Sequence, residues 1–116
     1  MEVQIFGVKK SAETRAALRF FAERRVKVHF VDFAVRGPSR GELTRFAQRF
    51  GVGALIDRTS RRFGELGLGS ASYSDDRWIE KLAAEPLVLK LPLVRYDREL
   101  TIGSAEPTWK LWVSGQ

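Results

Sequence analysis

Hydrophobic and polar residues alternate in two stretches near the start of the chain, and this period of two predicts β-strands. The first stretch covers residues 2–6, and the second covers residues 26–33. Between them, Ser11 is a suitable N-cap for a helix that continues to about Arg24 and is rich in good helix formers. The first third of the chain therefore predicts a strand, a helix and a second strand.

A helical period replaces the alternation after Gly37-Pro38. Ser39 and Glu42 have the Ser-x-x-Glu spacing of a capping box, and Gly51 stands where a helix-ending glycine is expected. The apolar residues between them are three and four positions apart, which is typical of a helix with one buried face. They are Leu43, Phe46, Ala47 and Phe50. We therefore expect both phenylalanines to lie in the core.

The rest of the middle section predicts more helix. Short helical segments are expected at residues 54–57 and 61–66, and Ser74 can cap a longer helix. Asp75 and Asp76 then place favourable negative charge at its N-terminus. The expected buried residues of this helix are Trp78, Ile79 and Leu82.

The period changes again near residue 85. Apolar runs at residues 87–89 and 93–96 predict strands, and Asp97-Arg98 can turn the chain into a strand at 99–103. A last helix is expected at residues 106–113, with its tryptophans in the core. The order of elements is typical of one α/β domain with a helical insertion.

Composition restricts the chemistry of the 116-residue chain. It has no cysteine, which excludes thiol nucleophiles, disulfide exchange and thiolate metal sites. Its single histidine, His29, excludes a multi-histidine metal site, so we expect neither a metal nor a cofactor. His29 itself is expected to be a packing residue of the second strand. The absence of a long apolar run or a signal-peptide pattern predicts no membrane association and a cytoplasmic location.

The net charge of +6 comes mostly from one region. Residues 36–62 hold seven arginines against Glu42 and Asp57. The candidate partner-binding residues in this part of the chain are Arg40, Arg45, Arg49, Arg61 and Arg62. A solvated face, an acidic protein partner and nucleic acid all remain open, and nucleic acid is the weakest because the nearby phenylalanines are expected in the core.

Several short motifs, in order, resemble the arsenate reductase family, the ArsC/Spx group of thioredoxin-like proteins. They are Phe6-Gly7-Val8-Lys9-Lys10-Ser11, Ala54-Leu55-Ile56, Phe63-Gly64-Glu65-Leu66-Gly67-Leu68, Pro86-Leu87-Val88-Leu89-Lys90-Leu91-Pro92-Leu93 and Leu100-Thr101-Ile102-Gly103. The resemblance implies an α/β, thioredoxin-like core, β-α-β plus β-β-α, formed by halves at about 1–36 and 85–116. It also implies a helical insertion at about 37–84 and a cis peptide bond before Pro92.

The resemblance does not extend to the catalytic residues. Family reductases have a nucleophilic cysteine at the position of Ser11, and a hydroxyl cannot replace sulfur in arsenate reduction. Three supporting arginines of the family fall on Asp57, Leu91 and Ser104, although Arg58 lies beside the first. These substitutions indicate a pseudoenzyme that retains the glutaredoxin-like fold without the reductase chemistry.

Three functions therefore remain open. The first is a non-catalytic binding or regulatory module, and the second is a residual reductase or transferase that uses glutathione or another thiol. The third is a regulator that binds RNA polymerase, because Gly51 matches a glycine of the family's transcription regulators. Residues that can hold a small anion or glutathione are Lys9, Lys10, Ser11, Arg58 and Pro92. The simpler interpretation of the loop is a serine cap beside two solvated lysines.

Overall fold

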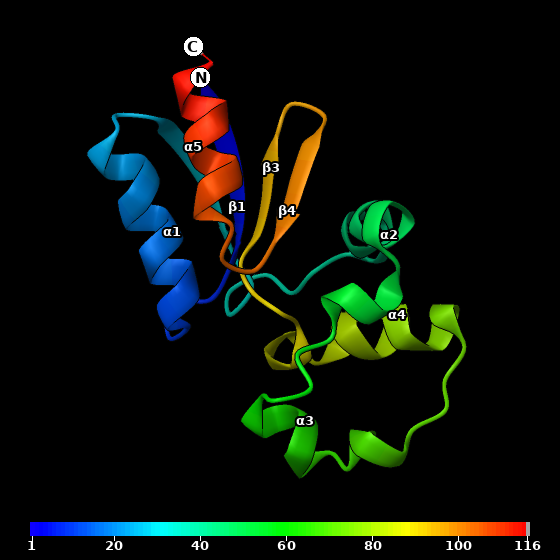
Figure 1. Ribbon diagram of the computed structural model, residues 1–116. Coiled ribbons are helices and arrows are strands. Elements are labelled where there is room, and N and C mark those ends of the chain that lie inside the picture. The colour runs from blue at the N-terminus through cyan, green and yellow to red at the C-terminus, as the bar shows by residue number, and fades with distance from the viewer. Residues whose placement is uncertain (116) are drawn as a thin grey trace. The chain divides into compact units, whose positions relative to one another are not determined.

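The structure, a computed structural model, describes residues 1–115 and divides into two compact units (Figure 1). The first unit comprises residues 1–36 and 91–115, and the second comprises residues 37–90. Each unit is described by itself below. No helix within the described residues is long and apolar enough to cross a membrane.

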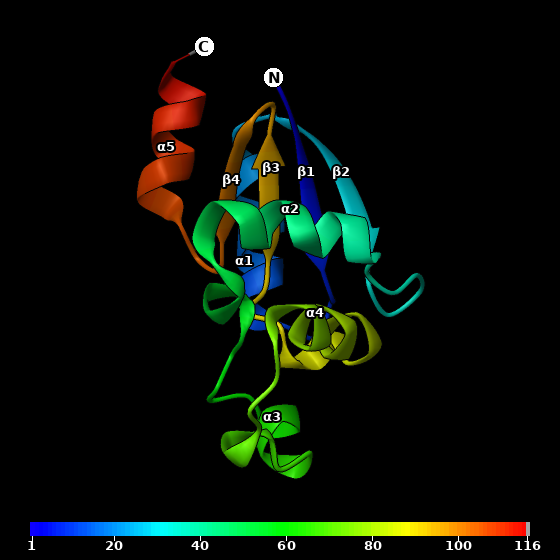
Figure 2. The ribbon, with the colours of Figure 1, turned by 90° about the vertical axis from the view of Figure 1, so that its right-hand side faces the viewer.

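A four-stranded mixed sheet forms the centre of the first unit. Its strands are β1 (Glu2–Gly7), β2 (Lys27–Asp32), β3 (Leu93–Tyr96) and β4 (Glu99–Ile102). They lie in the order β2-β1-β3-β4, as Figure 2 shows. β1 pairs parallel with β2 and antiparallel with β3, and β3 and β4 form an antiparallel hairpin. The predicted strands at both ends of the chain, and the hairpin, are confirmed.

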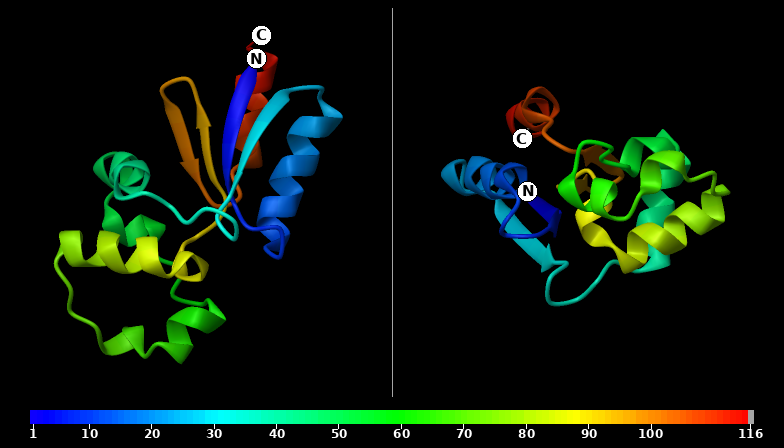
Figure 3. Two further views of the ribbon diagram at one scale, coloured as in Figure 1. Left: turned by 180° about the vertical axis from the view of Figure 1, so that it is seen from behind. Right: turned by 90° about the horizontal axis from the view of Figure 1, so that it is seen from below.

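Helices α1 (Ala12–Glu23) and α5 (Glu106–Ser114) cover one face of this sheet (Figures 1 and 3). Phe21 of α1 and Trp109 of α5 are at most 1% exposed, and their ring centroids are 5.4 Å apart. The indole Nε1 of Trp109 donates a hydrogen bond of 2.8 Å to the hydroxyl of Thr101 in β4. The aromatic side chains of the two helices therefore form the core on this face, as their spacing predicted.

The second unit is helical. Its longer helices are α2 (Arg40–Phe50) and α4 (Asp75–Ala84), and both begin at the predicted serine caps. Ser39 and Glu42 form the full capping box, and Gly51 ends α2 with a positive φ of 85°. The shorter elements are η1 (Val52–Leu55), α3 (Arg61–Glu65), η2 (Leu68–Ser70) and η3 (Pro86–Val88).

Two predicted elements of this unit differ from the structure. The prediction of a strand at residues 87–89 is wrong, because the chain forms the 3-10 turn η3 there. Only Leu89 makes a strand-like contact, an isolated bridge to Ile56. Pro86 explains the difference, since proline favours the first position of a helical turn and cannot donate to a strand ladder. The helical segment expected at 54–57 lies slightly earlier, as η1.

Two residues expected in the core are exposed. Phe50, the last residue of α2, is 43% exposed. His29 is also exposed, since its neighbours Val28 and Phe30 are the residues of β2 that pack toward the helices. Successive side chains of a strand point to opposite faces, so His29 points away from that core.

Candidate functional site

The loop between β1 and α1 brings together three of the predicted site residues, Lys9, Lys10 and Ser11. The amide of Ser11 donates 3.1 Å to the carbonyl of Val8, which closes a tight turn. Arg15, one turn into α1, donates 2.7 Å from its guanidinium to the carbonyl of Lys9. The ammonium groups of the two lysines are exposed. The loop backbone is therefore fixed by the helix that follows it.

Ser11 is the N-cap of α1. Its hydroxyl oxygen accepts the amide of Thr14 at 3.1 Å, and its proton is donated toward the carboxylate of Glu13 at 3.4 Å. The hydroxyl thus satisfies one of the four free amides of the first helical turn. Glu13 adds negative charge where the helix dipole is positive. The Ser11 hydroxyl and the Glu13 carboxylate therefore already interact with the positive end of the helix, where a bound anion would otherwise do so.

The end of β1 approaches α1 very closely behind this loop. A Cβ atom on Gly7 would lie only 2.5 Å from the hydroxyl oxygen of Thr14. Thr14 is fully buried, and within the described chain its hydroxyl has no hydrogen-bond partner. Glycine at position 7 is therefore what allows the helix to start so near the strand.

Pro92 lies at the same end of the sheet as this loop. Phe6 of β1 pairs with Leu93 of β3, so Pro92 is level with the point where β1 ends at Gly7. The Leu91-Pro92 bond is cis, which confirms the expectation from the family resemblance. The carbonyl of Pro92 accepts the amide of Gly103 at 2.8 Å, which fixes its position beside β4.

Arg58, the remaining anion candidate, belongs to the second unit. Its guanidinium lies 5.7 Å from the ring centroid of Phe63, a weak cation–π contact. The carboxylate of the neighbouring Asp57 accepts two hydrogen bonds from Thr59, one from its amide at 3.0 Å and one from its hydroxyl at 2.7 Å. Asp57 therefore acts as a turn residue within this unit.

The candidate arginines of the second unit fall into two groups. Arg62 forms an ion pair with Glu85 at 2.6 Å and another with Glu65, and Arg61 also pairs with Glu65. The hydrogen bond with Glu85, and then that with Glu65, raises the pKa of Arg62 above its usual value. Arg40, Arg45 and Arg49 of α2 are exposed, as is Arg61. Of these five arginines, Arg62 is thus the least accessible.

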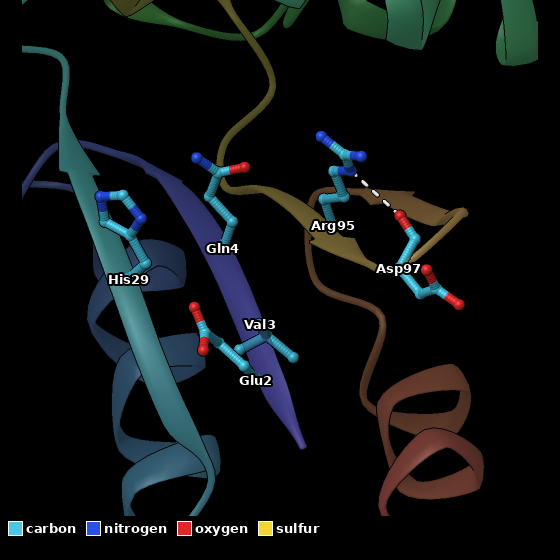
Figure 4. Close-up of a pocket in the computed structure, with 6 residues that line it drawn as sticks. All are labelled: Glu2, Val3, Gln4, His29, Arg95 and Asp97. Atoms are coloured by element: carbon cyan, nitrogen blue, oxygen red, sulfur yellow. Dashed lines mark hydrogen bonds between the residues drawn. The ribbon is translucent and has the colours of Figure 1, made fainter.

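A polar cavity on the sheet was not foreseen from the sequence (Figure 4). It has a volume of about 250 Å³ and lies entirely in the first unit. Its lining residues are Glu2, Val3, Gln4, His29, Arg95 and Asp97. The alternation of the strands shows from the sequence which of these residues are the polar ones, but only strand pairing brings them together at one cavity. Among residues 1–115, no three acidic or histidine side chains come together as a metal site.

The mixed sheet, built from β-α-β and β-β-α halves with a helical segment between them, is the thioredoxin-like arrangement. The sequence model of the ArsC family matches residues 6–111, and the chain belongs to this family.

Two relatives align with most of the chain. An arsenate reductase of Neisseria meningitidis serogroup A is 24% identical over 105 residues, covering 88% of this chain and 90% of the relative. The uncharacterised protein YusI of Bacillus subtilis is 24% identical over 110 residues, covering 91% and 93%.

Solved structures are similar over nearly the whole chain. An arsenate reductase from Vibrio cholerae has a TM-score of 0.81 at 25% identity, covering 97% of this chain and 98% of that structure. A putative ArsC family related protein from Bacteroides fragilis has a TM-score of 0.84 at 18% identity, covering 96% and 97%.

Proposed function

We propose that this chain is a non-catalytic member of the ArsC family that works as a binding or regulatory module. The hydrogen bonding of the Ser11 hydroxyl is the main support for this proposal. Its oxygen caps α1 through Thr14, and its proton is directed toward Glu13. No histidine is among its hydrogen-bond partners in the described residues, and the Glu13 carboxylate, at 3.4 Å, is a weak base for a hydroxyl; an unactivated hydroxyl is a poor nucleophile.

Arsenate reduction requires an electron donor as well as a nucleophile. Sulfur can change oxidation state by forming and breaking disulfides, whereas a serine hydroxyl cannot. The chain has no cysteine at any position, so it cannot supply these electrons itself. Turnover would have to depend wholly on an external thiol such as glutathione, with Ser11 only positioning the substrate.

Two surfaces support the binding role. The first is the loop of Lys9, Lys10 and Ser11 beside Pro92, where exposed ammonium groups and the α1 N-terminus favour an anion. The second is the set of exposed arginines of α2, in which Arg45 and Arg49 are one turn apart and Arg40 lies at the start of the helix; their charge favours an acidic partner protein. We expect α2 to contribute more to the charge of a partner site, because Glu13 already occupies the helix end of the loop.

A coupled assay tests the absence of catalysis. Purified protein is mixed with arsenate, glutathione, glutaredoxin, glutathione reductase and NADPH, with the Vibrio cholerae arsenate reductase as the positive control. We expect NADPH consumption equal to the blank. Consumption above the blank that scales with protein concentration would establish the thiol-dependent enzyme instead.

Ser11→Cys extends this test to the site. The new thiol lies at a helix N-terminus, so we expect its pKa to be lowered, yet arsenate reduction should not appear because the supporting arginines are absent. Ser39→Cys is the matched control, since it places a thiol at the cap of α2 outside the candidate site. Arsenate reduction in Ser11→Cys but not in Ser39→Cys would show that the anion site is intact and the proposal wrong.

Affinity capture from lysate, with and without nuclease, tests the binding role. We expect a protein partner that survives nuclease and is lost when Arg40, Arg45 and Arg49 are replaced by glutamine. The control replaces Arg19, Arg24 and Lys110 of the first unit, which removes the same charge. Recovery of RNA polymerase subunits would identify the regulator, and capture lost on nuclease treatment would indicate nucleic acid.

A further inference from the structure

A row of three polar side chains crosses three neighbouring strands of the sheet. Gln4 of β1 pairs with His29 of β2 on one side and with Arg95 of β3 on the other. Directly paired residues project from the same face of a sheet, and neighbouring strands are about 4.8 Å apart. Figure 4 shows the three side chains standing on one face with Gln4 in the middle. Strand pairing therefore aligns an imidazole, an amide and a guanidinium at the cavity.

The row contains hydrogen-bonding groups that the protein does not use. Within residues 1–115, the side chains of Gln4 and His29 form no hydrogen bond. Arg95 donates only through Nε, at 3.0 Å, to the carbonyl of Asp97 in the turn that follows β3. This bond holds the guanidinium by one edge and leaves both terminal NH2 groups for another acceptor. A carboxylate is the planar acceptor that fits such a pair of donors best.

The remaining charges of the cavity are negative. Glu2 lies two residues before Gln4 on β1, and Asp97 lies beyond Arg95. Glu2 is only loosely paired with Lys27, at 3.8 Å between two well-exposed side chains, so its carboxylate can accept another donor. A multiply charged anion such as phosphate is disfavoured by these two carboxylates. A ligand that carries one carboxylate and one ammonium group matches the cavity instead.

We propose that this cavity binds a free α-amino acid, with its carboxylate on Arg95 and the amide of Gln4, and its ammonium group on Glu2. Glu2 and Arg95 are diagonal neighbours across β1 and β3, so their backbone positions are roughly 7–8 Å apart. The Glu2 side chain is well exposed and can rotate, so its carboxylate can come within a hydrogen bond of about 2.9 Å of an ammonium group whose ligand carboxylate lies on Arg95. The cavity volume of about 250 Å³ suits a ligand of this size.

Titration followed by ¹H–¹⁵N NMR tests the proposal directly. Glycine, L-alanine and L-glutamate are the probes, because the side-chain amide of Gln4 and the backbone amides of β1 and β3 report on the site. We expect saturable shifts of these signals. Acetate, methylammonium and inorganic phosphate should shift them only at much higher concentration, since each offers part of the required charge pattern.

Two variants examine the contacts. Arg95→Gln removes the guanidinium, and Gln4→Glu places a carboxylate where the ligand carboxylate is expected. We expect each to weaken amino-acid binding about tenfold or more, the loss expected of one charge-assisted interaction. Arg19→Gln is the matched control, because it removes the same charge from α1, on the opposite face of the sheet. The same NMR spectra show that each variant is folded.

Several results would overturn the proposal. They are the absence of saturable shifts with every amino acid, equal binding of acetate or phosphate, and unchanged affinity in both Arg95→Gln and Gln4→Glu. Tighter binding of glycylglycine than of glycine would also contradict it, because the charged ends of a dipeptide are farther apart. The result is independent of the coupled assay, which concerns the Lys9–Ser11 loop.

Discussion

Replacing Gly7 with alanine tests the close approach of β1 to α1. The added Cβ would lie 2.5 Å from Oγ1 and 2.7 Å from Cγ2 of Thr14. Thr14 is fully buried, so its side chain cannot turn out into solvent. Gly7 is not among the glycines with a positive φ. The cost of Gly7→Ala should therefore come from the clash and not from the backbone conformation.

The size of the effect follows from two opposing terms. Overfilling a packed site costs about 1–3 kcal/mol, whereas Gly→Ala at an unstrained position stabilises by about 0.4–1 kcal/mol through the unfolded chain. We expect Gly7→Ala to lower the free energy of unfolding by about 1–2 kcal/mol. Gly53→Ala is the matched control, because a Cβ there meets nothing within 4 Å, and it should leave stability unchanged or slightly higher.

A double-mutant cycle with Thr14→Ala identifies the clash as the cause. Thr14→Ala removes both atoms nearest the new Cβ and leaves only its own Cβ, at 3.1 Å. It also removes a buried hydroxyl without a partner, a group that costs about 1–3 kcal/mol, against a lost methyl worth about 0.8 kcal/mol. Thr14→Ala alone should therefore not destabilise the protein, and it should rescue Gly7→Ala by about 1 kcal/mol or more.

Urea unfolding followed by tryptophan fluorescence measures the free energy of unfolding of the wild type, of the Gly53→Ala control and of the three variants of the cycle. Trp109 is 1% exposed in the core of the same unit, so its emission reports unfolding there. A Gly7→Ala protein within about 0.5 kcal/mol of the wild type would refute the reasoning, since surface changes commonly fall in that range. Strictly additive effects in the double mutant would refute it as well.

Two further predictions concern the ends of α1. Ser11→Ala should lower the free energy of unfolding by about 1 kcal/mol and Ser11→Asp should retain most of it, because both serine and aspartate cap helices; equal urea midpoints for Ser11→Ala and the wild type would contradict the capping role. Arg25, with φ of 57°, follows the helix in the left-handed region, so Arg25→Gly should stabilise by about 0.5–1 kcal/mol, and a lower thermal midpoint would contradict this.

The local elements could be predicted because their determinants are local. The capping box of Ser39 and Glu42, the cap at Ser11 and the alternation of β1 each depend on residues only a few positions apart. The same approach was wrong at residues 87–89, where an apolar run looked like a strand. A short apolar run has no distinctive period, and Pro86 decided in favour of a turn.

Burial was less predictable at the end of a helix and along the face of the sheet opposite α1 and α5. Phe50 follows the apolar stripe of α2 but is half-exposed at its last turn. His29 alternates with residues that pack on the core, and on its own face of β2 Lys27 and His29 are exposed whereas Val31 is buried. Periodicity shows which residues share a face, but only the packed structure shows whether that face is covered at a given point.

The sequence by itself determined the types of element, their order and the absence of a thiol, because these depend on residue identity and short spacings. Only the tertiary structure decided that Gln4, His29 and Arg95 stand side by side, and that Gly7 meets Thr14. Strand register and the approach of a helix to a strand depend on residues far apart in the chain. A shift of one residue in register would turn the polar row to the other face of the sheet.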